Sequence, residues 1–284
     1  MEWIRKRNGE LPMQVNTCGE VTYLTFPLLE ETGMVDHLFS TRLGGVSKGI
    51  YSSMNLSYTR GDLKEAVDEN FKRIAGIFGK TSDRIVCSKQ THTTNVRKVT
   101  QKDCGKGVTR PLDYTDVDGL ITNEEGVILA TFFADCVPLY FVDVKQRAIG
   151  LSHSGWRGTV QRMGQKTLLA MKKAYGTQAE DVYAAIGPSI CGDCYEVGEE
   201  VAEAFYKEFG ATAEAMLRKG KREGKYDLDL WKANETVLLE SGIKREHLEI
   251  TDLCTCCNRE LLFSHRASNG KRGNLGAFME LRKS

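Results

Sequence analysis

The sequence lacks an apolar run long enough to cross a membrane. Nowhere in its 284 residues do about eighteen consecutive apolar residues occur, the length that marks a transmembrane helix. The first residues, MEWIRKRNGELPMQ, also lack the apolar core of a secretory signal. We therefore expect no membrane association and a cytoplasmic location.

The sequence also lacks an excess of either charge. Lysine and arginine number 39 against 38 aspartates and glutamates, a formal net charge of +1. Nucleic-acid-binding proteins usually carry a broad basic surface, so we expect no nucleic-acid partner. The most basic run, residues 218–225, is interrupted by glycines and predicts a solvated loop between a helix and the next element.

Neither internal repeats nor a linker is visible, which predicts a single domain over residues 1–284. Amphipathic periods predict helices at 63–79, 160–175, 198–210 and 227–242. Apolar and β-branched runs predict strands at 21–29, 37–45, 84–99 (a pair around a tight polar segment), 118–123, 127–143, 148–155, 182–190 and 249–254. Residues 101–116 predict a long surface loop able to cover a site. Because helices and strands do not strictly alternate, the fold class is α+β, with mixed β-sheets flanked by helices.

Nine cysteines are an odd number in a chain too long to need disulfide staples, so we expect mostly reduced thiols. Five of the cysteines cluster in two segments. Cys191 and Cys194 form a C-x-x-C, and Cys254, Cys256 and Cys257 crowd the sequence DLCTCCN. The two segments would build a second, structural zinc site if they met in space. Without the paired spacing of a zinc ribbon, we interpret them as packed thiols.

Three polar residues stand out beside apolar, strand-like runs: His92 in SKQTH, Cys136 in FFADCVPLYFVD and His153 in GLSHSGWRG. Two imidazoles and one thiolate form the donor set of an open zinc site, in which the fourth tetrahedral position is left for water or substrate. The gaps between these residues are too long for one helix or knuckle, so the ligands must converge through tertiary structure. Alternatively, Cys136 is a small buried residue and the histidines are hydrogen-bonded filler.

Several motifs resemble a known family. SKQTH, DGLIT, ADCVPLYFVD, HSGWRGTV, GPSICGDCYEVGEEV, DLDLWKANETVLLESGI and CTCCNRELLFSHR follow, in order and over nearly the whole chain, the pattern of the YfiH/YlmD-type purine nucleoside phosphorylases. This family was formerly labelled multicopper polyphenol oxidase or laccase-domain proteins.

The resemblance implies a single-domain α+β fold similar to that of toxin-type cysteine deamidases. It also implies metal ligands at His92, Cys136 and His153. The implied activities are phosphorolysis of adenosine, inosine and methylthioadenosine, and deamination of adenosine. The chain departs from the family pattern near its end, where His265 precedes Arg266 in place of a frequent tyrosine.

Deamination requires an activated water and a group that protonates the leaving ammonia. Asp135, beside Cys136, is our candidate for that proton, and its alternative role is a buried structural carboxylate. Adjacent side chains in a strand point to opposite faces, which weighs against a joint role with Cys136.

Phosphorolysis requires cations that hold phosphate, and the purine nucleosides and phosphate are the expected partners. Arg42, Lys89 and Arg157 are the candidates, since arginine can grip phosphate through two parallel hydrogen bonds. Gln90 is a candidate reader of the base edge. Trp156 either stacks on the purine or packs in the interior.

Three other functions remain open. A copper-dependent polyphenol oxidase would use two histidines and one cysteine at a blue-copper site, but the chain has only five histidines for a further copper cluster, so zinc is the expected metal. A metal-free cysteine hydrolase would use Cys136 as nucleophile and His153 as base. A non-catalytic protein would bind an unusual nucleoside or a peptidoglycan fragment. The chain is expected to be a monomer or a homodimer.

Overall fold

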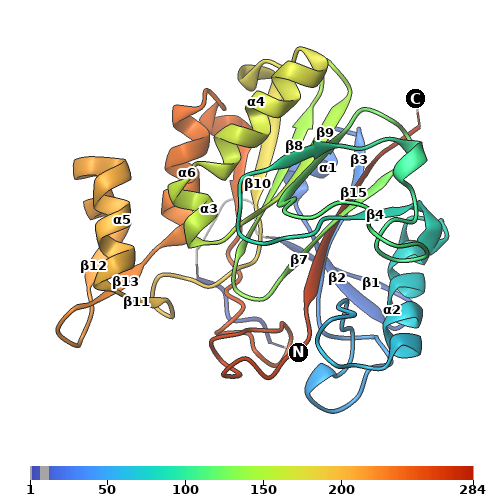
Figure 1. The fold of residues 1–284 in the computed structure, drawn as a ribbon, viewed down its shortest axis with the longest axis horizontal. Helices are drawn as coiled ribbons and strands as arrows, with labels where there is room; N and C mark the ends of the chain where they lie inside the picture. The colour runs from blue at the N-terminus through green and yellow to red at the C-terminus, as the bar shows by residue number, and fades with distance from the viewer. Residues whose placement is uncertain (1, 7–12, 284) are drawn as a thin grey trace.

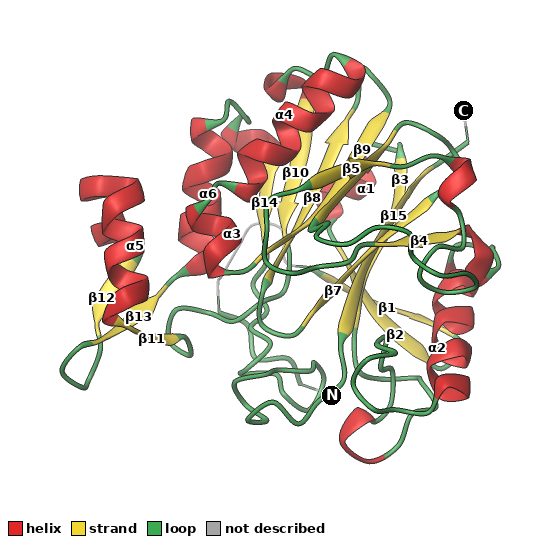
Figure 2. Ribbon diagram, viewed as in Figure 1, coloured by secondary structure: helices red, strands yellow, loops and turns green. Residues whose placement is uncertain are grey.

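The computed structural model describes residues 2–6 and 13–283. Within these residues the strands form two six-stranded sheets and one three-stranded sheet, and helices cover the outer faces of the two large sheets (Figures 1 and 2). Both large sheets combine parallel and antiparallel pairs. The predicted α+β class with mixed sheets is confirmed.

The first large sheet has the strand order β1-β2-β3-β15-β7-β4 and is antiparallel except where β4 pairs with β7. Its strands are β1 (Gln14–Cys18), β2 (Val21–Thr25), β3 (Val35–Ser40), β4 (Ile85–Cys87), β7 (Ile128–Phe133) and β15 (Leu275–Leu281). The last strand of the chain therefore lies in the middle of this sheet, between β3 and β7.

The second large sheet has the order β14-β10-β8-β9-β6-β5. Its strands are β5 (Val96–Lys98), β6 (Gly119–Thr122), β8 (Val137–Asp143), β9 (Ala148–Ser154), β10 (Val182–Ile186) and β14 (Leu248–Ile250). Every residue of β8 and β9 is buried. Both faces of these strands are covered, which explains why their sequences are nearly continuous apolar runs rather than alternating ones.

The helices are amphipathic and bury one face each. They are α1 (Pro27–Glu31), α2 (Lys64–Ile77), α3 (Trp156–Val160), α4 (Met163–Tyr175), α5 (Glu199–Phe209) and α6 (Leu230–Glu240). Helix α2 packs against the first sheet, and α4 and α6 pack against the second. The three-stranded sheet of β11 (Glu196–Gly198), β12 (Leu217–Lys219) and β13 (Lys225–Leu228) lies beside α5 at one side of the molecule (Figure 1).

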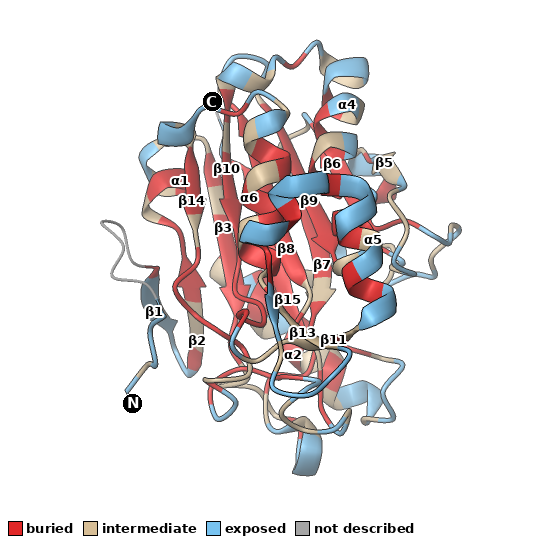
Figure 3. Ribbon diagram, turned by 90° about the vertical axis from the view of Figure 1, so that its left-hand side faces the viewer, coloured by how far each residue is buried: buried red, intermediate tan, exposed pale blue. Residues whose placement is uncertain are grey.

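The central core lies between the two large sheets. Phe39 and Leu129 of the first sheet share one apolar cluster with Tyr140 and Leu151 of the second. A second apolar cluster lies between the first sheet and α2, and a third lies between the second sheet and its covering helices. Figure 3 shows the buried strands between helices whose outer faces are exposed.

The expectation of an uninterrupted strand over residues 127–143 was wrong. Strand β7 ends at Phe133 in the first sheet, and β8 begins at Val137 in the second. The chain turns at Asp135, whose φ of 88° no extended strand adopts. This crossing from one sheet to the other places Cys136 at the junction between them.

Other element boundaries also differ from the expectation. The basic run holds the expected loop at residues 220–224, but its ends belong to the paired strands β12 and β13. The helix expected at 160–175 is divided at Arg162, which has a φ of 60°. The strand expected at 249–254 ends at Ile250. The helix expected at 63–79 is confirmed as α2, and Asp229 caps α6 by accepting a hydrogen bond from the Lys232 amide.

Among the described residues, no helix combines the length and the apolar character needed to cross a bilayer. This finding agrees with the absence of a long apolar run in the sequence.

Glu249 on β14 gives the fold a pH-dependent stability. Its Oε2 accepts a hydrogen bond from the Leu28 amide (2.9 Å), while its buried Oε1 has no hydrogen-bond partner among the described residues. Burial, more than any other cause, raises the pKa of Glu249 to about 8. The folded protein therefore keeps a proton that the unfolded chain releases above about pH 4.5, so this residue destabilises the fold as the pH rises toward 8.

We predict that Glu249→Gln stabilises the fold more at pH 8 than at pH 5. The change that it causes in the free energy of unfolding should be larger at pH 8 by at least about 1.4 kcal/mol, which corresponds to one pKa unit. Urea denaturation of both proteins at the two pH values measures this difference. The exposed Glu246→Gln is the control and should give no pH-dependent difference. Equal effects of Glu249→Gln at both pH values would contradict the burial of a protonated carboxyl.

Candidate metal centre and nucleoside cavity

The three predicted ligands converge although they come from separate parts of the chain. His92 lies in the loop between β4 and β5, Cys136 lies in the turn between β7 and β8, and His153 lies in β9. One ligand atom from each residue lies within 4.8 Å of the others, and Cys136 Sγ is 4.0 Å from His92 Nε2. His153 is buried, Cys136 is half-buried and His92 is exposed. The trio therefore forms one group that opens to solvent.

A buried carboxylate, Asp118, holds this group in place. Its Oδ1 lies 2.8 Å from His153 Nδ1, and its backbone carbonyl accepts the His153 amide at 2.8 Å. With Nδ1 donating to Asp118, the other ring nitrogen, Nε2, is free to bind a metal ion. This carboxylate fixes both the tautomer and the orientation of the imidazole.

The same carboxylate also fixes the loop that carries His92. The backbone amides of Thr91, His92 and Thr93 donate to Asp118 Oδ1 or Oδ2 at 3.0–3.1 Å, and the Thr93 hydroxyl donates to Oδ2 at 3.0 Å. His92 has a φ of 66°, a conformation that costs energy for a residue with a side chain. The hydrogen bonds to Asp118 hold the backbone in this conformation.

The ionisation of the group follows from these contacts. Burial opposes a charge on Asp118, but the hydrogen bond and charge of His153 and the loop amides lower its pKa to about 2. Burial likewise opposes a thiolate at Cys136, but the charge of His153 and hydrogen bonds with both histidines lower its pKa to about 6. Burial would lower the pKa of His153, which the charges of Cys136 and Asp118 raise to about 9. Without metal, these contacts favour a thiolate at Cys136 beside a protonated His153. The thiolate is the form that binds metal, and metal binding would release the proton of His153.

The donor set and its spacing fit a zinc ion. At ordinary zinc–nitrogen and zinc–sulfur distances, a tetrahedral site separates sulfur from nitrogen by about 3.6 Å, close to the 4.0 Å between Cys136 Sγ and His92 Nε2. Gly155 leaves the necessary room, since a Cβ there would lie 3.0 Å from Cys136 Sγ and 3.1 Å from His92 Cδ2. Three protein ligands would leave one coordination position open.

A cavity of about 370 Å³ adjoins the group, and all three ligands line it. Its volume falls in the range of small-molecule binding sites. The half-buried Phe132 and the side chains of Tyr58 and Phe71 form an aromatic wall, and the predicted covering loop contributes Leu112. An aromatic wall of this kind suits the flat face of a purine.

Three cations line the cavity: Arg60, Lys89 and Arg272. Arg272 is buried, and its Nε has no hydrogen-bond partner among the described residues. Its Nη1 donates to the Gly273 carbonyl at 3.1 Å and to Asn274 Oδ1, and none of its hydrogen-bond partners among the described residues is a carboxylate. Burial first, and then the charge of Arg60, lower the pKa of Arg272 to about 10. A buried guanidinium with an unused donor is suited to binding an anion.

Two of the cations expected from the sequence lie elsewhere. Arg42 donates to the carbonyls of Ser52 (2.8 Å) and Arg259 (2.9 Å) and lies over the Phe263 ring, beside a separate cavity of about 150 Å³. Arg157 is exposed and stacks on Trp156, which packs at the margin of the helix-covered core. Of the expected phosphate contacts, the structure therefore brings only Lys89 to the cavity.

Gln90 and Asp135 have positioning contacts. The Gln90 amide accepts from the Phe132 backbone amide and donates to the Phe132 carbonyl, both at 2.7 Å, so it orients the aromatic wall. Asp135 accepts hydrogen bonds from the Thr255 hydroxyl and the Arg266 amide, also at 2.7 Å. Its carboxylate holds the turn that presents Cys136, which matches the structural role considered for it above.

The sequence reasoning missed Asp118, Arg60, Arg272 and Phe132. The sequence does hold a signal for Asp118, because it directly precedes β6 at the edge where the polar segments gather. Arg60 and Arg272 lie in irregular segments far from the ligands in sequence. No local pattern distinguishes them from surface cations.

The remaining histidines do not gather at the metal group. His37 accepts a hydrogen bond from the Phe26 amide (2.8 Å), His247 stacks on Tyr183, and His265 Nδ1 lies 3.5 Å from Arg272 Nη2. Among the described residues, only two groups of histidine, cysteine or acidic side chains are close enough to hold a metal ion, and the second contains cysteines alone. The chain therefore lacks the histidine-rich cluster that a multicopper oxidase requires.

Comparison with known proteins identifies the family and relatives of this chain. The family model described as multi-copper polyphenol oxidoreductase laccase matches residues 36–282. The chain is 36% identical over 247 residues to "Purine nucleoside phosphorylase YlmD" of Bacillus subtilis, covering 87% of this chain and 88% of that protein. It is 33% identical over 237 residues to "Adenosine deaminase RL5" of an unknown prokaryotic organism, covering 80% and 87%.

A solved structure confirms the fold. The crystal structure of the hypothetical protein YfiH of Bacillus licheniformis superimposes with a TM-score of 0.89 at 30% sequence identity, covering 95% of this chain and 99% of that one. The two sequence relatives, a purine nucleoside phosphorylase and an adenosine deaminase, are nucleoside-processing enzymes by name.

We predict that Asp118→Asn weakens zinc binding at the open site about 10- to 100-fold, because the carboxylate that is hydrogen-bonded to a histidine ligand sets the tautomer and orientation of that histidine. Competition with a chromophoric chelator measures this affinity. Asp116→Asn is the matched control, since Asp116 is exposed and its carboxylate accepts from the Thr91 hydroxyl of the same loop, while its carbonyl accepts from Thr93 and Asn95. Equal zinc affinities of the two variants would show that Asp118 does not organise the ligands.

Proposed function

The chain belongs to the multi-copper polyphenol oxidoreductase laccase family, and from this premise we propose that it is a zinc-dependent purine nucleoside phosphorylase that also deaminates adenosine. One observation carries the proposal: an open His92–Cys136–His153 group and the buried Arg272, whose Nε has no hydrogen-bond partner among the described residues, line the same cavity. Phosphorolysis needs an anion site and a nucleoside site side by side. This cavity supplies both kinds of side chain.

Zinc is favoured over copper by the chemistry of the donor set. Two imidazoles and one thiolate with an open position form a common catalytic zinc site. A copper oxidase would need a second, histidine-rich cluster, and the other three histidines of the chain are dispersed. Zinc, when bound, supplies Lewis acidity at the open position.

In phosphorolysis, an oxygen of phosphate forms a bond to C1′ of the ribose while the bond from C1′ to the purine nitrogen breaks. The products are ribose 1-phosphate and the purine base, which leaves with a proton. We assign phosphate binding to Arg272, Arg60 and Lys89, whose charges hold the nucleophile in place. Phe132, oriented by Gln90, stacks on the base.

In deamination, water adds to C6 of adenosine and ammonia leaves, so phosphate is not needed. The nucleoside can occupy the same aromatic wall in both reactions. We also expect methylthioadenosine and inosine as substrates. The apolar side chains of Leu56 and Leu112 line the cavity and suit the methylthio group of the first as well as a ribose. The expected location is the cytoplasm, and the expected assembly is a monomer or a homodimer.

A metal-free cysteine hydrolase is the second candidate, and the Asp118–His153 hydrogen bond favours it specifically. Cys136, His153 and Asp118 have the nucleophile, base and orienting carboxylate of a catalytic triad. A triad has no use for His92, however, whose ring centroid lies 5.0 Å from that of His153. The second imidazole favours the metal site.

We predict that Cys136→Ala and His92→Ala each remove one equivalent of zinc per chain and lower adenosine turnover at least about a hundredfold. Even the loss of a residue that only hydrogen-bonds to a metal ligand reduces activity by about 10- to 100-fold. Metal analysis and assays for hypoxanthine and inosine measure both effects. Cys18→Ala, an exposed thiol, is the control. Full activity in His92→Ala, together with inactivity in Cys136→Ala, would favour the cysteine hydrolase instead.

We predict that Arg272→Gln raises the KM for phosphate on the order of tenfold to a hundredfold, the effect of losing a hydrogen bond between charged groups. The phosphate-independent deamination of adenosine should change less than about threefold, because it does not use this cation. Lys271→Gln, an exposed neighbour outside the cavity, is the control. Arg157→Gln tests the cation expected from the sequence, and a larger effect there would move the phosphate site to Arg157.

A further inference from the structure

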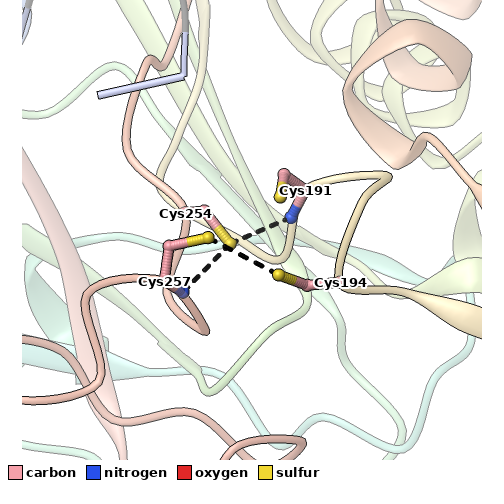
Figure 4. A group of neighbouring side chains, drawn as sticks. All are labelled: Cys191, Cys194, Cys254 and Cys257. Carbon is pink, nitrogen blue, oxygen red and sulfur yellow. Dashed lines mark hydrogen bonds between the residues drawn. The ribbon is translucent and has the colours of Figure 1, made fainter. Parts of the chain in front are cut away.

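Four cysteines far from the open site in sequence bring their sulfur atoms together. The Sγ atoms of Cys191, Cys194, Cys254 and Cys257 all lie within 4.8 Å of one another, and those of Cys194 and Cys257 are 3.5 Å apart. Figure 4 shows the four side chains converging from two segments. All nine cysteines lie in the described part of the chain, and all are free thiols. The two segments, which we interpreted as packed thiols, therefore do meet in space.

The sheet explains why they meet. Strands β10 and β14 are parallel neighbours, so the loops that follow them leave from the same edge. The pairing continues beyond the strands, where Ser189 and Cys254 form a parallel bridge and the Thr255 amide donates to the Ser189 carbonyl at 3.1 Å. The spacing in each loop is C-x-x-C. The sequence reading missed this in the second loop, because Cys256 stands between Cys254 and Cys257.

The distances fit a single tetrahedral ion bound by four thiolates. At a zinc–sulfur distance of about 2.3 Å, tetrahedral geometry separates the sulfurs by about 3.8 Å. This is close to the 3.5 Å between Cys194 and Cys257 and below the 4.8 Å within which all four sulfurs lie. An iron–sulfur cube binds each thiolate through a different iron atom and would hold the four sulfurs farther apart. The compact arrangement favours one ion of zinc.

Hydrogen bonds and charges support the thiolate form of this cluster. The backbone amides of Cys191 and Cys257 donate to Cys254 Sγ at 3.2 and 3.4 Å, and such contacts orient metal ligands and offset their charge. Lys6 and Arg218 line an adjoining cavity of about 260 Å³ that reaches Cys191. Both cations also pair with the Asp193 carboxylate, so they offset only part of the negative charge that zinc leaves on four thiolates.

We propose that Cys191, Cys194, Cys254 and Cys257 bind a structural zinc ion, a second metal site separate from the open one. With four protein ligands this site has no vacant position, so it holds segments together and performs no chemistry. It joins the loops after β10 and β14. The amino-terminal segment is attached to the same loop, since the Ile4 amide donates to Asn258 Oδ1 at 2.8 Å.

The closed site also positions the open one. Each of the two cysteine loops donates a hydrogen bond to Asp135: the Ile190 amide to its carbonyl (3.0 Å) and the Thr255 hydroxyl to its carboxylate (2.7 Å). Asp135 forms the turn that presents Cys136. Zinc at the cysteine cluster therefore fixes the backbone on which the open site is built.

Metal analysis of the intact chain tests the proposal without relying on activity. The wild-type protein should contain two zinc ions per chain, Cys136→Ala should contain one, and Cys257→Ala should contain one. Cys256→Ala is the matched control, because it removes the thiol next to Cys257 that lies outside the cluster, and it should retain two. Zinc-free Cys136→Ala protein, or Cys257→Ala protein with two zinc ions, would overturn the proposal.

Cobalt spectroscopy covers the case in which Cys257→Ala does not fold. Cys136→Ala keeps all four clustered thiols, so its cobalt-loaded form should show the intense thiolate-to-cobalt absorption and the visible bands of a tetrahedral four-thiolate site. Absence of these bands, or iron in place of zinc, would refute the closed site. Neither measurement uses turnover, and Cys136→Ala isolates the closed site, so its single zinc ion tests this proposal alone. Failure of the open site would instead appear as one zinc ion in the wild-type protein.

Discussion

The buried carboxylate of Asp118 is the contact on which the candidate active site depends. It is fully buried, and an ionised carboxylate in such a place is very costly unless hydrogen bonds replace its water. Three loop amides, one hydroxyl and one imidazole supply them. The need to satisfy one charge thus fixes the position of His92 and His153 together, although 60 residues separate them (153 − 92 − 1).

The second requirement is the crossing of the chain between the two sheets. Strands β7 and β8 would run on as one long apolar strand if residues 134–136 were extended. Instead Asp135 turns the chain, and its carboxylate ties this turn to Thr255 and Arg266. Cys136 is therefore presented at the junction of two layers, half-buried and beside a cavity, rather than packed inside one sheet. The geometry of a turn, more than the chemistry of the thiol, makes this cysteine available.

The sequence predicts well those features that depend on local composition. The helix at α2 and the cap at Asp229 are predictable, because periodicity and capping residues are visible over short windows. The three residues of the open group stand out as rare donor side chains beside strand-like runs. The turn at Asp135 is not, since no glycine or proline marks it and apolar residues continue on both sides. Asp118 is one of three aspartates within six residues; its place directly before β6 separates it from Asp113 and Asp116 in the sequence, but its burial is a property of the fold.

The phosphate candidates were less predictable for a related reason. An arginine is useful to an anion when its own protein leaves it unpaired, and pairing is a property of the folded state. Arg42, which the sequence favoured, uses its donors on two backbone carbonyls. Arg272 has a buried donor left over, yet its neighbourhood in the sequence resembles any polar loop.

The two cysteine-containing groups illustrate how ligand number decides the role of a metal site. His92, Cys136 and His153 offer three ligands beside a cavity, so an ion there would keep a position for substrate. The four cysteines offer a complete set at the edge of the parallel β10–β14 pair, so an ion there would be closed. Asp135 contacts both loops of the closed group and precedes a ligand of the open one. A rigid closed site would hold the strained turn at Asp135 in place. The open site would then gain its fixed geometry from four cysteines that do not take part in its chemistry.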